Sequence, residues 1–365
     1  MDPATDEVAS RKWVARRDEA RAQGRHLGIG YSFHVEITAP GPTRIMNMAG
    51  LQHSSFDEEV VRIDSSGGVT VYTGQSALGR GHPDRPRPGL QAESLGVPLE
   101  TVTVVVGDTD TCAFTGYGTG GSRAAALGGA AVIRASGRLK EKVLRIAGHM
   151  LEADPKDLEI SDGIISIAGV PGRSITMAEI GDASYRRING RLPEGESPTL
   201  EERDVFDPDN VAFSYGCTAV LAEVDTETGV VTLVEYLMAH DCGTVINPTI
   251  VDGQIRGGAA QAIGGALYEE LVYGPDGQIQ TTTFMDYLIP TASEIPDMDI
   301  LHMETPAEHI PGGFKGVGEG GTIGGAAAIA GAVDDALSEA GVFTTSLPIT
   351  PPRLLAAMKA GAAQR

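Results

Sequence analysis

The chain has 365 residues, of which 41% are hydrophobic and 5% aromatic, so it can bury the core of one large domain or two ordinary ones. Its formal net charge of −21 argues against nucleic-acid or anionic-membrane partners, which are themselves negatively charged. The three cysteines include no C-x-x-C pair, which excludes an iron–sulfur or zinc framework within the chain and argues against a secreted disulfide scaffold.

The N-terminal part begins with charged residues and continues with strand-like patterns. Residues 1–25 are predicted to form a charged helix and linker. They lack the apolar stretch of a signal peptide, and no run of about 18 apolar residues occurs further on, so we expect a cytoplasmic protein. Alternating apolar residues predict strands over 24–38, 60–64, 69–73 and 101–106.

The middle of the chain changes from strands to a long helix. "TGYGTGGS" (115–122) is a glycine-rich loop that leads into a helix of small residues. A β-hairpin is predicted over 158–168, with Asp162-Gly163 at its turn. The polar stretch 186–210 is interpreted as a connection between a first lobe, 26–185, and a second lobe, 211–365.

The second lobe repeats this alternation of strands and helices. We expect strands over 217–224 and 230–238, a helix over 253–270, a strand near 280–287, and a last Ala-rich helix after a glycine-rich segment. "LPITPPRLLAAM" predicts a Pro-bounded helix at the end of the chain. The fold class is therefore α+β, with two lobes, mixed sheets and Gly/Ala-rich helices.

Two glycine-rich segments align without gaps. They are "GTGGSRAAALGGAA" (118–131) and "GEGGTIGGAAAIAG" (318–331). Each places a hydroxyl residue, Ser122 or Thr322, at a predicted helix N-terminus, where free N–H groups suit anionic or strongly polar ligands. Either the two lobes are pseudo-repeats, or the Gly/Ala-rich composition alone produces the match.

Several longer motifs follow one another in a fixed order. They are "GDTDT", "GYGTGGSR", "AHDCGTVINPTIVDGQIRGGAAQAIGGALYEE" (239–270), "MDYLIPTASEIPDM" (285–298), "GGFKGVGEGGTIGGAAAIAGAVDDAL" (312–337) and "LPITPPRL". This series closely resembles the C-terminal, molybdopterin-binding portion of the large subunit of the xanthine oxidase and aldehyde oxidase family, the molybdenum hydroxylases. The large subunits of that family have a further N-terminal half, so we expect a split large subunit or a fragment of one.

The resemblance implies a reaction and a base. Molybdenum hydroxylases oxidise an aldehyde or an N-heterocycle with water as the oxygen source. Glu319 in "GVGE" matches their general base, since a carboxylate within hydrogen-bond reach can accept the proton that is released. Without the other motifs, the segment favours an exposed turn glutamate on a flexible linker as the interpretation of Glu319.

The resemblance also implies cofactor contacts. Gln254 in "DGQIRGG" matches a glutamine that contacts the pterin with its donor and acceptor groups, and Arg123 is expected to pair with a phosphate. A solvent-facing Gln254 and a surface Arg123 are the alternatives. The remaining expected contacts are Gly79, Arg80, Gly81, His82, Gly120, Gly121, Ser122, Lys315, Gly316, Val317 and Gly318. No side chain is expected to bind molybdenum, which the pterin dithiolene holds.

One segment departs from the family pattern. Arg80 replaces a glutamine of the family, and three prolines at 83, 86 and 88 interrupt an expected helix. A proline in a helix interior costs about 3 kcal/mol. Two explanations stay open, a true local rearrangement or a pair of compensating frame changes in the coding sequence, and peptide masses over 80–95 distinguish them.

The implied cofactor is molybdopterin, in its cytosine dinucleotide form, with molybdenum. The implied partners are the N-terminal half of the large subunit as a separate chain, a 2Fe–2S subunit and an FAD subunit, arranged as a heteromer or a dimer of heteromers. Two alternatives are part of a carbon monoxide dehydrogenase-type large subunit and a non-catalytic structural half-subunit. A nucleotide-binding protein is disfavoured, because no G-x-G-x-x-G motif follows a strand with the expected acid.

Overall fold

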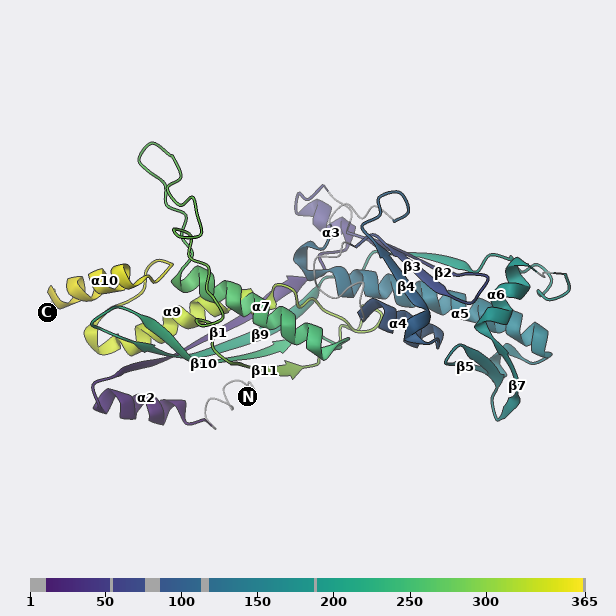
Figure 1. Cartoon of the computed structure of the whole chain (residues 1–365), viewed down its shortest axis with the longest axis horizontal. Coiled ribbons are helices and arrows are strands. Elements are labelled where there is room, and N and C mark those ends of the chain that lie inside the picture. Colours follow the sequence, from purple (N-terminus) through teal and green to yellow (C-terminus); the bar gives the residue numbers. More distant parts are fainter. Residues whose placement is uncertain (1–10, 53–54, 76–85, 113–117, 187–188, 364–365) are drawn as a thin grey trace.

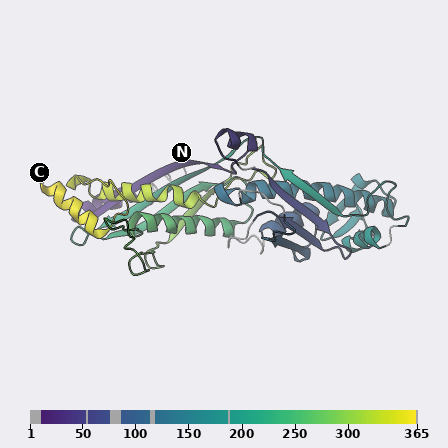
Figure 2. The same ribbon diagram turned by 90° about the horizontal axis from the view of Figure 1, so that it is seen from above.

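The computed structural model describes residues 11–52, 55–75, 86–112, 118–186 and 189–363. The molecule is elongated, and two lobes follow each other along its long axis (Figures 1 and 2). None of the helices in these ranges is both long and apolar enough to cross a membrane.

One lobe is built on a four-stranded mixed sheet. Its strand order is β1-β9-β10-β11, with β9 antiparallel to both neighbours and β11 parallel to β10. Apolar side chains on one face of the sheet pack against α7 and α9, and Trp13 of α2 packs on the other face. The bounds are β1 (His26–Thr38), β9 (Ala212–Val224), β10 (Val231–Asp241), β11 (Met298–Met303), α2 (Trp13–Ala22), α7 (Pro248–Leu267), α8 (Gly320–Ile323), α9 (Gly325–Ala336) and α10 (Pro351–Ala363).

The other lobe contains a second four-stranded mixed sheet. Its strand order is β4-β3-β2-β8, with β2 antiparallel to both neighbours and β4 parallel to β3. The long helix α5 packs on this sheet. The bounds are β2 (Asp57–Ile63), β3 (Val69–Thr73), β4 (Val102–Val106), β8 (Glu201–Phe206), α3 (Thr43–Met48), α4 (Pro86–Leu95) and α5 (Gly129–Leu151), followed by the three-stranded sheet β5 (Leu158–Ser161), β6 (Ile164–Ile167), β7 (Val170–Thr176) and by α6 (Met177–Tyr185).

The two four-stranded sheets share one topology. In each lobe an antiparallel hairpin is followed by a helix, a parallel strand, a glycine-rich loop and a second helix (β2-β3-α4-β4-α5 and β9-β10-α7-β11-α9). In each lobe an antiparallel edge strand completes the sheet, β8 beside β2 and β1 beside β9. The similarity of the two glycine-rich segments therefore reflects repeated architecture and not composition alone, and the predicted α+β fold with two lobes is confirmed.

The edge strands are exchanged between the lobes. β1 precedes the first repeat in sequence but pairs with β9 of the second, and β8 precedes the second repeat but pairs with β2 of the first. The strands therefore do not follow the predicted lobe boundaries. The predicted first lobe, 26–185, includes β1, which lies in the sheet of the second lobe. The predicted connection, 186–210, includes β8, which lies in the sheet of the first lobe.

In the second lobe one predicted strand is absent and one observed strand was missed. Residues 280–287 form turns and irregular structure within the excursion between α7 and β11, which projects from the lobe (Figure 1). Strand β11 was not predicted. Residues 280–287 have a strand-like composition, but in the described structure no neighbouring strand pairs with them. Strand β11, in contrast, pairs with β10 along its length.

The prolines of the unusual segment do not break a helix interior. Within the described residues α4 begins at Pro86, so Pro86 and Pro88 lie in the first turn that the structure describes. The N–H groups of a first turn have no helical acceptor, and proline is tolerated there. The cost expected for interior prolines therefore does not arise at these two positions, while Pro83 lies outside the described residues.

Candidate functional site

The two glycine-rich loops meet at Ser122 and Glu319. Ser122 lies in a tight turn, Gly120–Ser122, ahead of α5, and Glu319 directly precedes α8. The Ser122 hydroxyl donates to Glu319 Oε2 at 3.0 Å, and Ser122 Oγ accepts the Glu319 backbone N–H at 3.1 Å. One hydroxyl thus fixes both the backbone and the carboxylate of the predicted base.

Close packing explains the glycines around Glu319. A Cβ at Gly316 would lie 2.7 Å from the Cβ of Thr38 and overlap Ser122. A Cβ at Gly320 would overlap the imidazole of His240, which is buried under the loop. Gly316 N–H also donates to Thr38 Oγ1 at 3.0 Å. The segment is therefore a packed loop between the two lobes, which contradicts the flexible-linker alternative.

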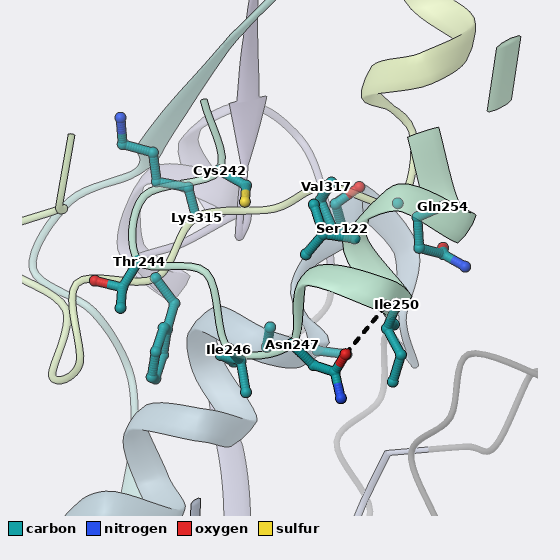
Figure 3. Close-up of a pocket in the computed structure, with 14 residues that line it drawn as sticks. Ser122, Cys242, Thr244, Ile246, Asn247, Ile250, Gln254, Lys315 and Val317 are labelled. Atoms are coloured by element: carbon teal, nitrogen blue, oxygen red, sulfur yellow. Dashed lines mark hydrogen bonds between the residues drawn. The ribbon is translucent and has the colours of Figure 1, made fainter. Parts of the chain in front are cut away.

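A cavity that is partly open to solvent lies beside this contact. Its wall is mostly apolar, with Thr244, Asn247 and Gln254 among its polar members (Figure 3). The N-terminal part of α7 forms one side, because Asn247 accepts the Ile250 N–H at 3.3 Å and Pro248 follows as the first helical residue. The lining residues are Ser122, Ala124, Ala125, Cys242, Thr244, Ile246, Asn247, Ile250, Val251, Gln254, Phe314, Lys315, Val317 and Gly318.

Five residues predicted from the sequence line this cavity. They are Ser122, Gln254, Lys315, Val317 and Gly318. Of the other predicted residues that the structure describes, Glu319, Gly120, Gly121, Gly316 and Arg123 lie outside the lining. Gly79, Arg80, Gly81 and His82 fall outside the described ranges.

Arg123 lies in the core. It is 0% exposed, and its Nη2 donates to the carbonyl oxygens of Ser55 at 2.9 Å and Phe56 at 2.6 Å. This position contradicts the surface alternative. It gives Arg123 a structural contact with the segment before β2, and a phosphate contact of Arg123 stays a prediction.

The Lys315 side chain is held by a buried ion pair. Lys315 Nζ lies 3.1 Å from Asp241 Oδ1 and 4.7 Å from the centre of the Tyr215 ring. Burial disfavours the charge of Asp241, but hydrogen bonds from Thr305, Gly243 and Lys315 outweigh it and lower the pKa of Asp241. Figure 3 shows the Lys315 amine pointing away from Ser122 and Gln254, so its charge fixes the loop and its stem contributes to the wall.

The sequence prediction missed most of the apolar wall. The predicted helix began at 253, whereas the cap at Asn247 and the proline after it start α7 at Pro248 and bring Ile250 and Val251 to the cavity. Cys242 also lines the cavity, and burial raises the pKa of its thiol to about 11. Within the described ranges, no three or more His, Cys, Asp or Glu side chains are grouped so that they could hold a metal ion.

Comparisons with known proteins identify the family of the chain. The profile of the molybdopterin cofactor-binding domain family matches residues 4–296. The nicotine 6-hydroxylase large subunit of Paenarthrobacter nicotinovorans is 38% identical over 98% of the chain and 44% of its own length. The carbon monoxide dehydrogenase large chain of Afipia carboxidovorans is 36% identical over 85% of the chain and 37% of its own length.

A solved structure is equally similar. Quinoline 2-oxidoreductase from Pseudomonas putida 86 superposes with a TM-score of 0.89 and 40% identity, over 97% of the chain and 44% of the longer protein. The chain thus spans less than half the length of these relatives. It belongs to the molybdopterin cofactor-binding domains of the xanthine oxidase family and corresponds to the C-terminal portion of a molybdenum hydroxylase large subunit.

Proposed function

We propose that the chain holds molybdopterin in the cavity beside Ser122 and supplies Glu319 as the general base of a molybdenum hydroxylase. The observation that carries this proposal is the double hydrogen bond of Ser122 with the N–H and the carboxylate of Glu319. Ser122 also lines the cavity. A single side chain therefore connects the cavity wall with the base and sets the direction of the carboxylate.

A mostly apolar wall with a few polar groups suits a polar-edged ring such as a pterin. The primary amide of Gln254 offers both a donor and an acceptor, and Val317 and Gly318 bring the loop backbone to the cavity. When bound, the cofactor supplies the redox chemistry of molybdenum. The chain's own residues orient it through Gln254, exclude water with the apolar wall, and accept a proton at the Glu319 carboxylate.

The proposal includes the cytosine dinucleotide form of the cofactor, which rests on the family resemblance. Arg123 Nη2 is engaged by two backbone carbonyl groups, so a phosphate contact of this residue rests on the family resemblance alone. Asn247, which caps α7, and Thr244 line the cavity, whereas Arg123, whose head group is bound to Ser55, does not.

The proposed substrate is an N-heterocycle or an aldehyde, oxidised with oxygen from water. The names of two relatives, nicotine 6-hydroxylase and quinoline 2-oxidoreductase, support N-heterocycles first. The similarity to carbon monoxide dehydrogenase large chains supports carbon monoxide as the second candidate. Turnover tested with N-heterocycles, aldehydes and carbon monoxide in isotopically labelled water separates these classes.

A companion chain is part of the proposal. β1 presents an apolar row on the face opposite α9, with Tyr31, Phe33, Val35 and Ile37 exposed by 40%, 63%, 65% and 57%. Exposed rows of this kind mark interaction surfaces. The relatives are more than twice as long as the chain. On the family resemblance we assign this row to the N-terminal half of the large subunit, proposed as a separate chain, with 2Fe–2S and FAD subunits completing electron transfer.

The decisive variant is Glu319→Gln, purified with its companion chains. It retains a hydrogen-bonding group for Ser122 but cannot accept a proton, so we expect turnover to fall by about a hundredfold or more while bound molybdenum stays unchanged. Glu308→Gln, on an exposed loop, is the matched control and should behave as wild type. Wild-type turnover of Glu319→Gln would refute the assignment of the base.

A further inference from the structure

A second carboxylate, Glu36, lies on β1 between two contacts of the segment that carries Glu319. Gly316 is hydrogen-bonded to Thr38, and a Cβ at Gly324 would lie 3.3 Å from His34 Nδ1. Glu36 is on β1 opposite Ser214 of β9, and the Ser214 hydroxyl donates to Glu36 Oε2 at 3.0 Å. Thr38, two residues further on the same face of β1, accepts the N–H of Gly316. The loop that carries Glu319 is thus fastened over the end of β1, on the face from which Glu36 projects.

The surroundings of Glu36 favour proton uptake. The pKa of Glu36 is raised to about 6, and burial is the largest cause. The hydrogen bond from the Ser214 hydroxyl lowers this pKa, whereas the charge and hydrogen bonding of Glu319 raise it. His34 of β1 and His240 of β10 also lie on this face of the sheet, and burial lowers the pKa of both. Both histidines are therefore neutral near pH 7, and Glu319 is the charge that acts on Glu36.

We propose that Glu36 takes over the proton that Glu319 accepts during the reaction, which restores the base for the next turnover. The inference rests on the proposed function of Glu319. In this step the O–H bond of protonated Glu319 breaks and an O–H bond forms on Glu36. Only a proton moves, and neither group is oxidised or reduced. Glu36 does not reach the reacting atoms and acts only through Glu319.

The pairing of two carboxylates explains the direction of transfer. Two adjacent carboxylates share a single proton more readily than they bear two negative charges. A carboxyl with a raised pKa also takes up a proton more readily than an ordinary glutamate. Because Glu36 is half-buried, it can hold the proton away from the cavity.

The first test needs no turnover. Infrared difference spectra of the full chain with its companions, recorded over a pH series, follow the carbonyl stretch of the protonated Glu36 carboxyl, which is identified by its loss in Glu36→Gln. Two variants should move its midpoint in opposite directions. Ser214→Ala removes the hydrogen bond that lowers the pKa and raises the midpoint, and Glu319→Gln removes the neighbouring charge and lowers it.

The second test separates one turnover from many. In Glu36→Gln, reduction of the enzyme in a single turnover should stay within about twofold of wild type, because Glu319 still accepts the first proton. Steady-state turnover should fall by about tenfold or more, since the base is no longer restored. Glu36→Asp, which keeps a proton acceptor, should recover at least part of the loss.

The outcomes distinguish the two proposals. Loss of single-turnover reduction in Glu319→Gln together with wild-type steady-state rates in Glu36→Gln would overturn the role of Glu36 and leave the base in place. A Glu36 midpoint that does not move in Glu319→Gln would also overturn it. Unchanged turnover in Glu319→Gln would instead overturn the proposed function.

Discussion

At the scale of single residues, one buried ion pair holds the loop that carries Glu319. Lys315 directly precedes the glycines that lead to Glu319, and both Lys315 and Asp241 are almost fully buried. Asp241 also accepts the N–H groups of Gly243 at 2.9 Å and Thr305 at 3.3 Å. These bonds tie the loop to the end of β10, so the ion pair positions the base without touching it.

Lys315→Met tests this role. The variant keeps the apolar stem but leaves the Asp241 charge buried without its cation, a change that typically costs about 3 to 5 kcal/mol. We expect a loss of that order in the free energy of unfolding, measured by chemical denaturation. Lys359→Met, at an exposed position of α10, is the control and should change it by less than about 0.5 kcal/mol. Equal stability of the two variants would contradict the role of the pair.

At the scale of elements, small residues let α9 lie directly on β1. A side chain at Gly30 would overlap the carbonyl oxygen of Ala328, and one at Gly28 would overlap that of Ala332. The helix backbone therefore rests on the strand backbone. This contact accounts for the two glycines of β1 and for the Gly/Ala-rich character of α9.

Gly30→Ala should be markedly destabilising for this reason. The added methyl group has no space without a shift of α9, and overpacking of this kind costs about 1 to 3 kcal/mol. Gly137→Ala is the matched control, because a Cβ at this helical position meets no atom within 4 Å. Alanine should stabilise that helix by about 0.5 to 1 kcal/mol. Thermal unfolding of the two variants should show shifts of opposite sign, and a stabilised Gly30→Ala would contradict the packing.

The elements with local signals could be predicted from the sequence. The hairpin turn at Asp162-Gly163, the helices after the glycine loops and most strands of the hairpins were confirmed. The edge strands β8 and β11 were missed because they are short and pair with β2 and β10, which are distant in sequence or separated by a helix. Their strand character comes from tertiary pairing, which local composition does not encode.

The candidate site was predictable where it rests on motifs. Gln254, Ser122 and the residues before Glu319 were identified from the sequence and do meet at one cavity or at its edge. The buried position of Arg123 and the ion pair of Lys315 were not predicted, since the partners Ser55 and Asp241 lie 68 and 74 positions away. Long-range contacts of charged side chains leave no periodic pattern in a sequence.

At the scale of the whole molecule, the exchanged edge strands join the two lobes. β1 forms thirteen residue pairs with β9, from His26↔Val224 to Thr38↔Ala212. Without β1, the sheet of the second lobe would expose the unpaired N–H and C=O groups of β9 and lose the surface on which α9 rests. Neither lobe is therefore a continuous segment of the chain, although the topology is repeated.

This exchange predicts how fragments behave. A fragment of residues 211–365 lacks β1 and should aggregate or remain unfolded. Fusing residues 11–40 to its N-terminus through a flexible linker restores β1 and α2, and we expect recovery of native circular dichroism and a cooperative unfolding transition. A cooperative transition of 211–365 alone would contradict the structural role of the exchanged strand.

The most direct measurement of the central claim is metal and pterin analysis of the native complex. The chain, purified under native conditions from its own host, should contain molybdenum and pterin in equal amounts and in proportion to the chain, together with a companion polypeptide. Gln254→Ala should reduce both cofactor components in parallel. A stable native form that lacks molybdenum, pterin and companion would contradict the claim that this chain is the cofactor-binding part of a molybdenum hydroxylase.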